Sequence, residues 1–448
     1  MTPASLSWFQ IFRLGLVQTA LGAVVVLTTS TLNRIMIVEL ALPAMLPGAL
    51  VALHYALQVL RPRLGHGSDI GGRRTPWILG GMAALALGGV GAAIATAWMS
   101  VNLWAGIALA VLAFCMIGIG VGACGTTLLV LLAKRVDVHR RAAAATIVWV
   151  MMIAGFIVTT AVAGRLLDPY SPARMVAVAS TVSILAMGLT VIALWHIEDP
   201  LPPSKKTAAS SSAPRNTSFG AALSEAWSEP RARRFTVFVF VSMLAYSAPE
   251  LILEPFAGAV FGLTPGQSTT LASVQHGGVL AGMALVAMIS TAVGGRGFAS
   301  MRIWTVGGCA ASAVALVNLA GAGLAAPAWP LRTTVFLLGL ANGVYAVAAI
   351  GSMMSLVGAG QKSREGVRMG LWGAAQAIAF GLGGLVGTLA SDFARLILGS
   401  ASLAYGAVFA GEAALFLVSA VLALCVNADE KPVAMRPFNN VAKLSVPE

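Results

Sequence analysis

The chain has 448 residues, of which 58% are hydrophobic and only 10% are charged, and its formal net charge is +12. This composition holds more apolar surface than one or two water-soluble cores can bury, which excludes an ordinary soluble protein and predicts an integral membrane protein. Because lipid cannot hydrogen-bond to an open backbone, we expect the spanning segments to be helices.

Apolar stretches long enough to cross a bilayer predict twelve transmembrane helices. In chain order, the predicted spans are Phe12–Thr31, Leu40–Leu60, Trp77–Ala97, Leu103–Leu132, Ala143–Ala163, Met175–Trp195, Phe235–Leu253, Thr269–Ala292, Ile303–Ala322, Thr333–Val357, Val367–Leu389 and Leu403–Val426. The first stretch runs into Asn33 and Arg34 instead of a small-residue cleavage site, so we expect a retained helix and not a signal peptide.

Basic residues in the gaps between these spans predict the orientation in the membrane. All but five of the 28 Lys and Arg residues fall on one side, and the positive-inside rule places that side, with both termini, in the cytoplasm. Because they are dispersed over short loops, they do not form a nucleic-acid-binding surface. The five on the opposite side are Arg34, Arg165, Arg174, Arg332 and Arg395.

The longest hydrophilic interval, residues 197–234, is rich in Pro, Ser and Lys and predicts a cytoplasmic linker. It separates an N-terminal six-helix half, residues 1–196, from a C-terminal six-helix half, residues 235–426, with a cytoplasmic tail at 427–448. Six plus six helices are typical of an internally duplicated transporter fold with a ligand site between the halves near the bilayer midplane.

The gap after the second span reads "LRPRLGHGSDIGGRRTPWILGGM" and is unusually rich in glycine and arginine. Glycines permit a sharp turn, and opposite charge stabilises an aspartate beside two arginines. The pattern resembles the cytoplasmic signature loop of the major facilitator superfamily, which latches the two halves, although Ile70 stands where that motif often has arginine. The alternative is that these arginines only follow the positive-inside rule. The latch candidates are Gly65, Asp69, Gly72, Arg73 and Arg74.

Four further segments resemble the PucC/LhaA family of purple phototrophic bacteria. They read "TLNRIMIVELALPA", "LEPFAGAVFGL", "GLANGVYAV" and "GLWGAAQAIAFGLGGLVGT". The resemblance implies an all-α facilitator-fold protein of the bacterial inner or intracytoplasmic photosynthetic membrane that handles bacteriochlorophyll and assists light-harvesting assembly. The wording "LTTSTLNR" looks most like the branch encoded among late bacteriochlorophyll-synthesis genes. The partners implied are a late pigment-synthesis enzyme or an antenna polypeptide.

Ionisable groups inside a bilayer are costly, so each is a candidate for binding or transport. Arg34 and Glu39, at the outer end of the first span, either pair with each other or a polar ligand, or are an interfacial arginine and a loop carboxylate. Glu250 and Glu254 stand four residues apart and share a helix face. They either repel and bind protons, or play a solvated structural role near the outer surface.

Two histidines, His54 and His276, fall within predicted spans. A neutral imidazole can ligate the magnesium of a chlorin, and the alternative is a hydrogen bond to a neighbouring helix. Gln376, in the glycine-rich eleventh span, and Asn342, beside Gly339 in the tenth, could each donate to a pigment carbonyl. The alternative for these glycine-rich helices is tight packing.

We therefore expect a non-enzymatic membrane factor that binds or delivers bacteriochlorophyll or a precursor, or docks a pigment-synthesis enzyme or antenna polypeptide. The alternative is a proton-coupled secondary transporter of a small solute. A catalytic subunit would need an acidic prenyl-diphosphate motif, and the chain has no such motif and no nucleotide-binding or hydrolase signature. The four cysteines are interpreted as apolar fillers, and we expect neither a metal site nor any cofactor beyond a bound pigment.

Overall fold

The computed structural model describes residues 6–61, 73–137, 140–198, 230–292, 301–358 and 365–426. These residues form helices and short turns, with no β-strand among them. The first span is α1 (Trp8–Val26) continued by the π-helical turn η1 (Leu27–Thr31), α2 (Leu32–Arg34) and a second π-helical turn η2 (Ile35–Glu39). The others are α3 (Met45–Leu57) with η3 (Gln58–Leu60), α5 (Thr75–Met99), α6 (Leu103–Arg135), α7 (Arg141–Leu167), α8 (Pro172–Leu194), α10 (Pro230–Phe261), α11 (Pro265–Ala292), α12 (Met301–Ala322), α13 (Leu331–Gly358), α14 (Glu365–Leu398) and α15 (Ala401–Val426).

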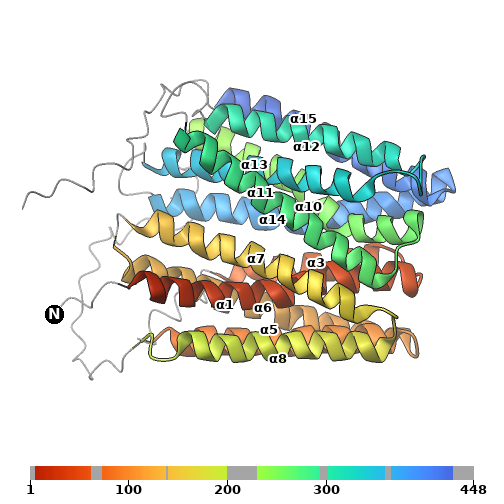
Figure 1. Ribbon diagram of the computed structural model, residues 1–448, viewed down its shortest axis with the longest axis horizontal. Coiled ribbons are helices and arrows are strands. Elements are labelled where there is room, and N and C mark those ends of the chain that lie inside the picture. The colour runs from red at the N-terminus through yellow and green to blue at the C-terminus, as the bar shows by residue number, and fades with distance from the viewer. Residues whose placement is uncertain are drawn as a thin grey trace, which may run out of the picture.

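The helices run side by side and form two groups, α1 to α8 and α10 to α15 (Figure 1). One apolar core, containing Leu14 and Phe114, fills the first group, and a second, containing Phe256 and Phe409, fills the other. Helix α3 packs along α14, and α7 packs along α11, across the seam between the groups. These two helix pairs therefore position the side chains through which one half contacts the other.

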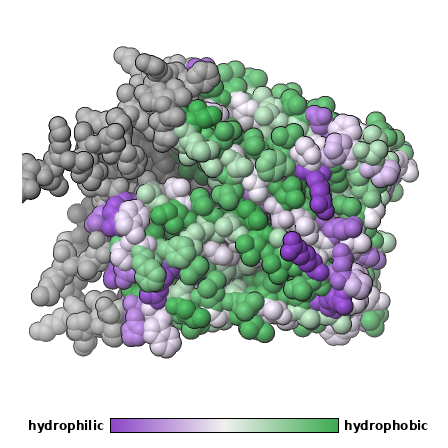
Figure 2. All heavy atoms as spheres, in the orientation of Figure 1, coloured by the Kyte–Doolittle hydropathy of each residue, from purple (hydrophilic) through white to green (hydrophobic). Residues whose placement is uncertain are grey.

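An apolar band covers the helices between hydrophilic residues at the two ends of the bundle (Figure 2). In the described part of the chain, eleven helices are long and apolar enough to cross a membrane. The predicted second span, Leu40–Leu60, is shorter: its helix starts at Met45, because Ala41 has a positive φ of 52° and residues 40–44 turn before it.

Three helices extend well beyond their predicted ends. The first runs to Glu39 instead of Thr31, the seventh runs through Pro255 to Phe261 instead of ending at Leu253, and the eleventh runs to Leu398 instead of Leu389. Polar side chains in these extensions find partners on neighbouring helices, so they do not end the helices. The extensions carry Arg34 and Glu254 into the protein interior, where both side chains are buried.

The predicted latch loop lies mostly outside the described residues, and so does most of the predicted linker and all of the predicted tail. Of the latch candidates, Arg73 and Arg74 are described, at the start of α5. The Glu198 carboxylate accepts hydrogen bonds from the backbone N–H groups of Arg74 and Thr75 and from the Thr75 hydroxyl, each at 2.8 Å. Glu198, at the start of the predicted linker, therefore caps α5 of the N-terminal half and makes no contact with the other half in these hydrogen bonds.

Candidate functional site

In the described part of the chain, several polar contacts between the halves lie at one end of the bundle. We call it the outer end: it holds Glu39, Asp168, Leu263 and Asp392, and the distribution of basic residues predicts that it faces away from the cytoplasm. The opposite end is called the inner end. There, Arg13 donates to the Trp195 carbonyl. That contact stays within the N-terminal half.

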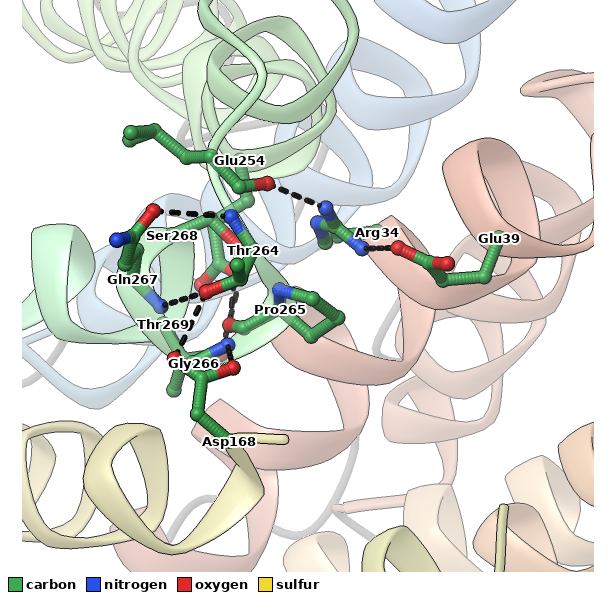
Figure 3. A network of polar contacts seen from close by, with 11 residues as sticks. Arg34, Glu39, Asp168, Glu254, Thr264, Pro265, Gly266, Gln267, Ser268 and Thr269 are labelled. Atoms are coloured by element: carbon green, nitrogen blue, oxygen red, sulfur yellow. Dashed lines mark hydrogen bonds and ion pairs between the residues drawn. The ribbon is translucent and has the colours of Figure 1, made fainter. Parts of the chain in front are cut away.

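Asp168, which follows α7 in the N-terminal half, caps the first turn of α11 in the C-terminal half (Figure 3). Its carboxylate accepts from the Thr264 hydroxyl at 2.8 Å and from the Gly266 backbone N–H at 3.3 Å. A Cβ at Gly266 would lie 2.2 Å from the Gly164 carbonyl oxygen, so only glycine permits this approach. The helix N-terminus favours the negative charge.

Asp392 makes the reciprocal contact. It lies near the end of α14 in the C-terminal half and accepts from the backbone N–H groups of Ala44 at 3.0 Å and Met45 at 2.8 Å, at the start of α3. Each half thus supplies an aspartate that caps a helix of the other half. The two contacts join α7 to α11 and α14 to α3, which are the helix pairs that pack across the seam.

Arg34 adds a third link at the outer end. Its side chain is 2% exposed, and it donates to the Glu39 carboxylate at 2.5 Å and to the Leu263 carbonyl of the other half at 2.7 Å. The π-helical turn that ends at Glu39 suits this pair, because residues five apart are neighbours in that geometry. Gly258 makes room, since a Cβ there would lie 2.9 Å from the guanidinium. Arg34 is therefore an interior residue and does not snorkel at the interface.

Tyr170, in the short loop between α7 and α8, lies beside this ion pair. Burial raises the pKa of its hydroxyl, the Glu39 carboxylate raises it further, and the Arg34 guanidinium opposes both. The tyrosine therefore remains neutral and does not add charge to the pair.

Deeper along the seam, one hydroxyl group of the first span and one of α11 contact Glu254 of α10. Ser30 donates to one carboxylate oxygen, and Thr269 of α11 donates to the other at 3.4 Å. The Thr31 and Thr269 hydroxyls lie 3.1 Å apart. Asn33 donates to the Leu251 carbonyl at 2.5 Å. Glu254 is therefore part of a buried network between the halves and has no solvated role.

Glu250, one turn before Glu254, belongs to a second cluster and keeps 27% of its side chain exposed. It accepts from the Gln275 amide at 3.3 Å, and its other oxygen lies 4.0 Å from Nε2 of His276. We call Glu250, Gln275 and His276 the central cluster. Both acids of the predicted pair thus lie inside the bundle, but each has its own partners.

The hydrogen bonds of His276 fix its tautomer. Its Nδ1 lies 2.8 Å from the Ala272 carbonyl oxygen, which can only accept, so Nδ1 carries the proton. In a neutral ring this leaves the lone pair on Nε2. The Phe156 ring of α7 meets the imidazole edge-on, with centroids 4.9 Å apart, so the histidine lies at the seam.

Aromatic side chains from both halves adjoin the central cluster. Phe380 of α14 contacts Tyr55 of α3 at 5.4 Å and Tyr246 of α10 at 5.7 Å between ring centroids. Tyr246 precedes Glu250 by one helical turn of α10, so these rings lie next to the cluster. The arrangement brings aromatic rings from both halves, one carboxylate and one imidazole together along the seam.

The other predicted ligand residues are not members of the central cluster. The Nε2 atom of His54 lies 3.0 Å from the Gln58 amide, both side chains are buried, and the His54 ring contacts Tyr55 with centroids 4.7 Å apart. Asn342 accepts from the Ser312 hydroxyl at 2.8 Å and so faces α12. Gln376, in α14, is half-buried.

Glycines of α13 and α14 serve helix packing. A Cβ at Gly339 would lie 2.0 Å from the Gln275 carbonyl oxygen, and one at Gly343 would lie 2.1 Å from that of Val279, so α13 lies directly against the backbone of α11. A Cβ at Gly383 would lie 2.1 Å from the Ser247 hydroxyl of α10. These contacts favour tight packing over a pigment groove at those positions.

Several of these residues are not singled out by the sequence analysis. Asp168 and Asp392 are two of them, because a cap between halves leaves no local pattern in the sequence. Glu412, fully buried in α15, had a visible signal: it is a single acid within an otherwise apolar span, "AGEAALF".

Solved structures with a similar fold are membrane transporters. The nucleoside transporter NupG matches with a TM-score of 0.62 at 14% identity, covering 94% of this chain and 99% of that chain. A bacterial homologue of the human lysosomal transporter Spinster, in an inward-facing conformation, matches with a TM-score of 0.63 at 14% identity, covering 94% and 96%. These likenesses show the major facilitator fold.

Relatives in sequence are more informative. A Rhodobacter capsulatus protein named bacteriochlorophyll synthase 44.5 kDa chain is 52% identical over 426 residues, 95% of this chain and 96% of its own. Protein PucC of Cereibacter sphaeroides is 30% identical over 390 residues, 83% of this chain and 81% of its own. The family described as PUCC protein matches residues 31–431. This membrane protein with a major facilitator fold therefore belongs to the PUCC protein family.

Proposed function

We propose that this protein binds bacteriochlorophyll or a precursor and hands it on during the assembly of photosynthetic complexes, without catalysing pigment synthesis. The names of the relatives, a bacteriochlorophyll synthase chain and protein PucC, support a role in this process. The fold supports binding between two halves, because facilitator-type proteins hold their ligands there.

The observation that carries the proposal is the geometry of His276. Its proton is committed to the Ala272 carbonyl, so Nε2 offers a lone pair at the seam between the halves. A chlorin magnesium takes such an axial ligand, and neutral imidazole is a good one. The nearest oxygen of Glu250 lies 4.0 Å from Nε2, beyond hydrogen-bonding distance, so no hydrogen bond joins Glu250 to this nitrogen.

The surroundings support a flat, mostly apolar ligand. Phe156, Tyr55, Tyr246 and Phe380 offer aromatic surface from both halves, and aromatic faces pack well against a conjugated ring. Gln376 remains the candidate donor to a ring carbonyl, because its amide is half-buried. His54 is a weaker candidate, since the Gln58 amide already occupies its Nε2 atom.

The route of entry follows from where the halves are joined. Asp168, Asp392 and Arg34 link the halves at the outer end. Among the described residues, the inner-end contacts of Arg13 with the Trp195 carbonyl and of Arg234 with the Cys425 carbonyl each remain within one half. This arrangement supports pigment entry from the inner end or from the lipid, and not through the outer end.

Binding measurements on three proteins with two pigments test directly whether His276 ligates the magnesium. Wild type and the His276→Ala and His54→Ala variants are titrated with bacteriochlorophyllide and with its magnesium-free counterpart. We expect His276→Ala to weaken binding of the magnesium pigment by about tenfold, ~1.4 kcal/mol, and to leave the metal-free pigment unaffected. His54→Ala tests the weaker candidate and should change the affinity for the magnesium pigment less than His276→Ala does. Equal affinity of all three proteins for the magnesium pigment would exclude ligation by His276.

Docking and the lack of catalysis need separate measurements. We expect the full-length protein to co-purify from gently solubilised membranes with a late pigment-synthesis enzyme or an antenna polypeptide. Incubated alone with bacteriochlorophyllide and a prenyl diphosphate, it should yield no esterified pigment. Product formed by the purified chain would overturn the non-enzymatic assignment. Reporter fusions at each end should place both termini in the cytoplasm of the inner or intracytoplasmic membrane.

The second candidate is proton-coupled transport of a small solute, favoured by the carboxylates that Glu250 and Glu254 place at the seam. Reconstituted vesicles distinguish the two functions. A proton gradient that drives solute uptake, abolished by Glu250→Gln, would support transport. Pigment binding without such uptake supports the proposal above.

A further inference from the structure

Glu412 is a carboxyl group enclosed in the apolar core of the C-terminal half. It lies near the middle of α15, is 4% exposed, and neither of its oxygens accepts a hydrogen bond from any described residue. Its neighbour is Gly387 of α14, whose missing Cβ would lie 3.7 Å from Oε1 and 2.7 Å from the Ala248 Cβ of α10. The carboxyl thus sits where α10, α14 and α15 meet.

The two protonation states of this carboxyl have different needs. A carboxylate requires several donors to replace its water, and an unpaired charge in an apolar interior costs many kcal/mol. A neutral carboxylic acid needs one acceptor for its O–H, and the carbonyl groups of a helix backbone can serve. Because no donor contacts either oxygen, only the neutral form suits this site.

We propose that Glu412 is a proton-binding site of the C-terminal half, occupied while the outer end is closed. The site is separate from the central cluster and needs no pigment. Its proton is enclosed by α14, which also carries Asp392, the cap on α3. Opening of the outer end releases α14 from its cap on α3, and in this proposal the proton exchanges with solvent only in that open state.

Infrared spectroscopy of the full-length protein in lipid tests occupancy. A neutral carboxyl in an apolar site absorbs at the high-frequency edge of the carboxyl C=O region. We expect this band in wild type and in Glu198→Gln, and its loss in Glu412→Gln, which matches the neutral form in shape. Glu412→Asp should shift the band. Identical spectra for wild type and Glu412→Gln would show that Glu412 is ionised and overturn the proposal.

Exchange into D2O tests the role of α14. The shift of the Glu412 band should be slow in wild type and about five- to thirtyfold faster in Asp392→Ala, the factor that one or two kcal/mol gives. Glu198→Ala removes a cap that lies within one half and should leave the rate unchanged. Equal rates in wild type and Asp392→Ala would overturn the coupling between Glu412 and the outer end.

Discussion

Removing the Asp392 carboxylate should open the outer end of the bundle. In the structure both of its oxygens accept backbone N–H groups at the start of α3, which belongs to the other half. In Asp392→Ala those two donors lose their partner as long as the halves stay together. When the halves separate, water can reach the donors, so the substitution penalises the closed state alone.

The size of the effect follows from the two bonds. Loss of a helix N-cap costs about 0.5–2 kcal/mol, and a hydrogen bond to a charged group contributes about 1.5–3 kcal/mol. Met45 is partly exposed, so water repairs some of the loss. We expect the closed state to lose about 1–2 kcal/mol, which raises the ratio of open to closed molecules about five- to thirtyfold.

Spin labels across the outer end measure that ratio. Val101, 83% exposed between α5 and α6, and Leu396, 84% exposed in α14, accept labels without disturbing packing. Wild type should show one short distance, and Asp392→Ala should add a longer one. The labels are attached to cysteines introduced at these two positions, in a protein whose native cysteines are replaced by alanine. The native cysteines are Cys115, Cys124, Cys309 and Cys425.

Three control variants isolate the cause. Asp392→Asn keeps one acceptor oxygen and should have a smaller effect, because asparagine caps helices nearly as well as aspartate. Asp168→Ala removes the reciprocal cap and should resemble Asp392→Ala. Glu198→Ala removes a cap within one half and should leave the distances unchanged. If Glu198→Ala opened the outer end as much as Asp392→Ala, general destabilisation would be the cause, and the idea that the Asp392 cap holds the outer end closed would be refuted.

Three further predictions concern packing, the buried network and the latch. Gly343→Ala should lower the free energy of unfolding by about 1–3 kcal/mol, because the added methyl group overpacks against α11. Gly277→Ala, with open space around it, should leave this free energy unchanged. Equal melting temperatures of the two variants would contradict this packing. Glu254→Leu leaves buried hydroxyls without their acceptor and should cost about 1–3 kcal/mol in thermal unfolding; an unchanged midpoint would argue against the network. Asp69→Asn should increase cysteine labelling at the inner end more than Asp137→Asn does, and equal labelling would remove the latch.

The sequence was sufficient to predict the fold class, because apolar length and the asymmetry of basic residues are read directly from the chain. The predicted ends of helices were wrong where polar residues remain inside. Arg34 marked the end of the first span in the sequence, yet it pairs with Glu39 and with the Leu263 carbonyl, so the helix continues. The Leu263 carbonyl is 229 residues away from Arg34 in sequence, and no local pattern reveals it as a partner.

The candidate site was predictable only in part, because its residues are conspicuous in the sequence whereas their contacts are not. An ionisable residue in an apolar span is conspicuous, which singled out Glu250 and His276. Which of them meet depends on how two halves dock, and the tautomer of His276 depends on the Ala272 carbonyl one turn earlier. Asp168 and Asp392 look like ordinary residues at helix ends until the opposite half is in place.

The absorption spectrum of the gently purified full-length protein tests pigment binding most directly. Protein from a bacteriochlorophyll-producing cell should elute with near-infrared absorption of a bacterial chlorin, and His276→Ala prepared in parallel should elute with clearly less pigment at the same protein yield. A wild-type protein that carries no chlorin, and takes none up when bacteriochlorophyllide is added, would contradict the proposed pigment site.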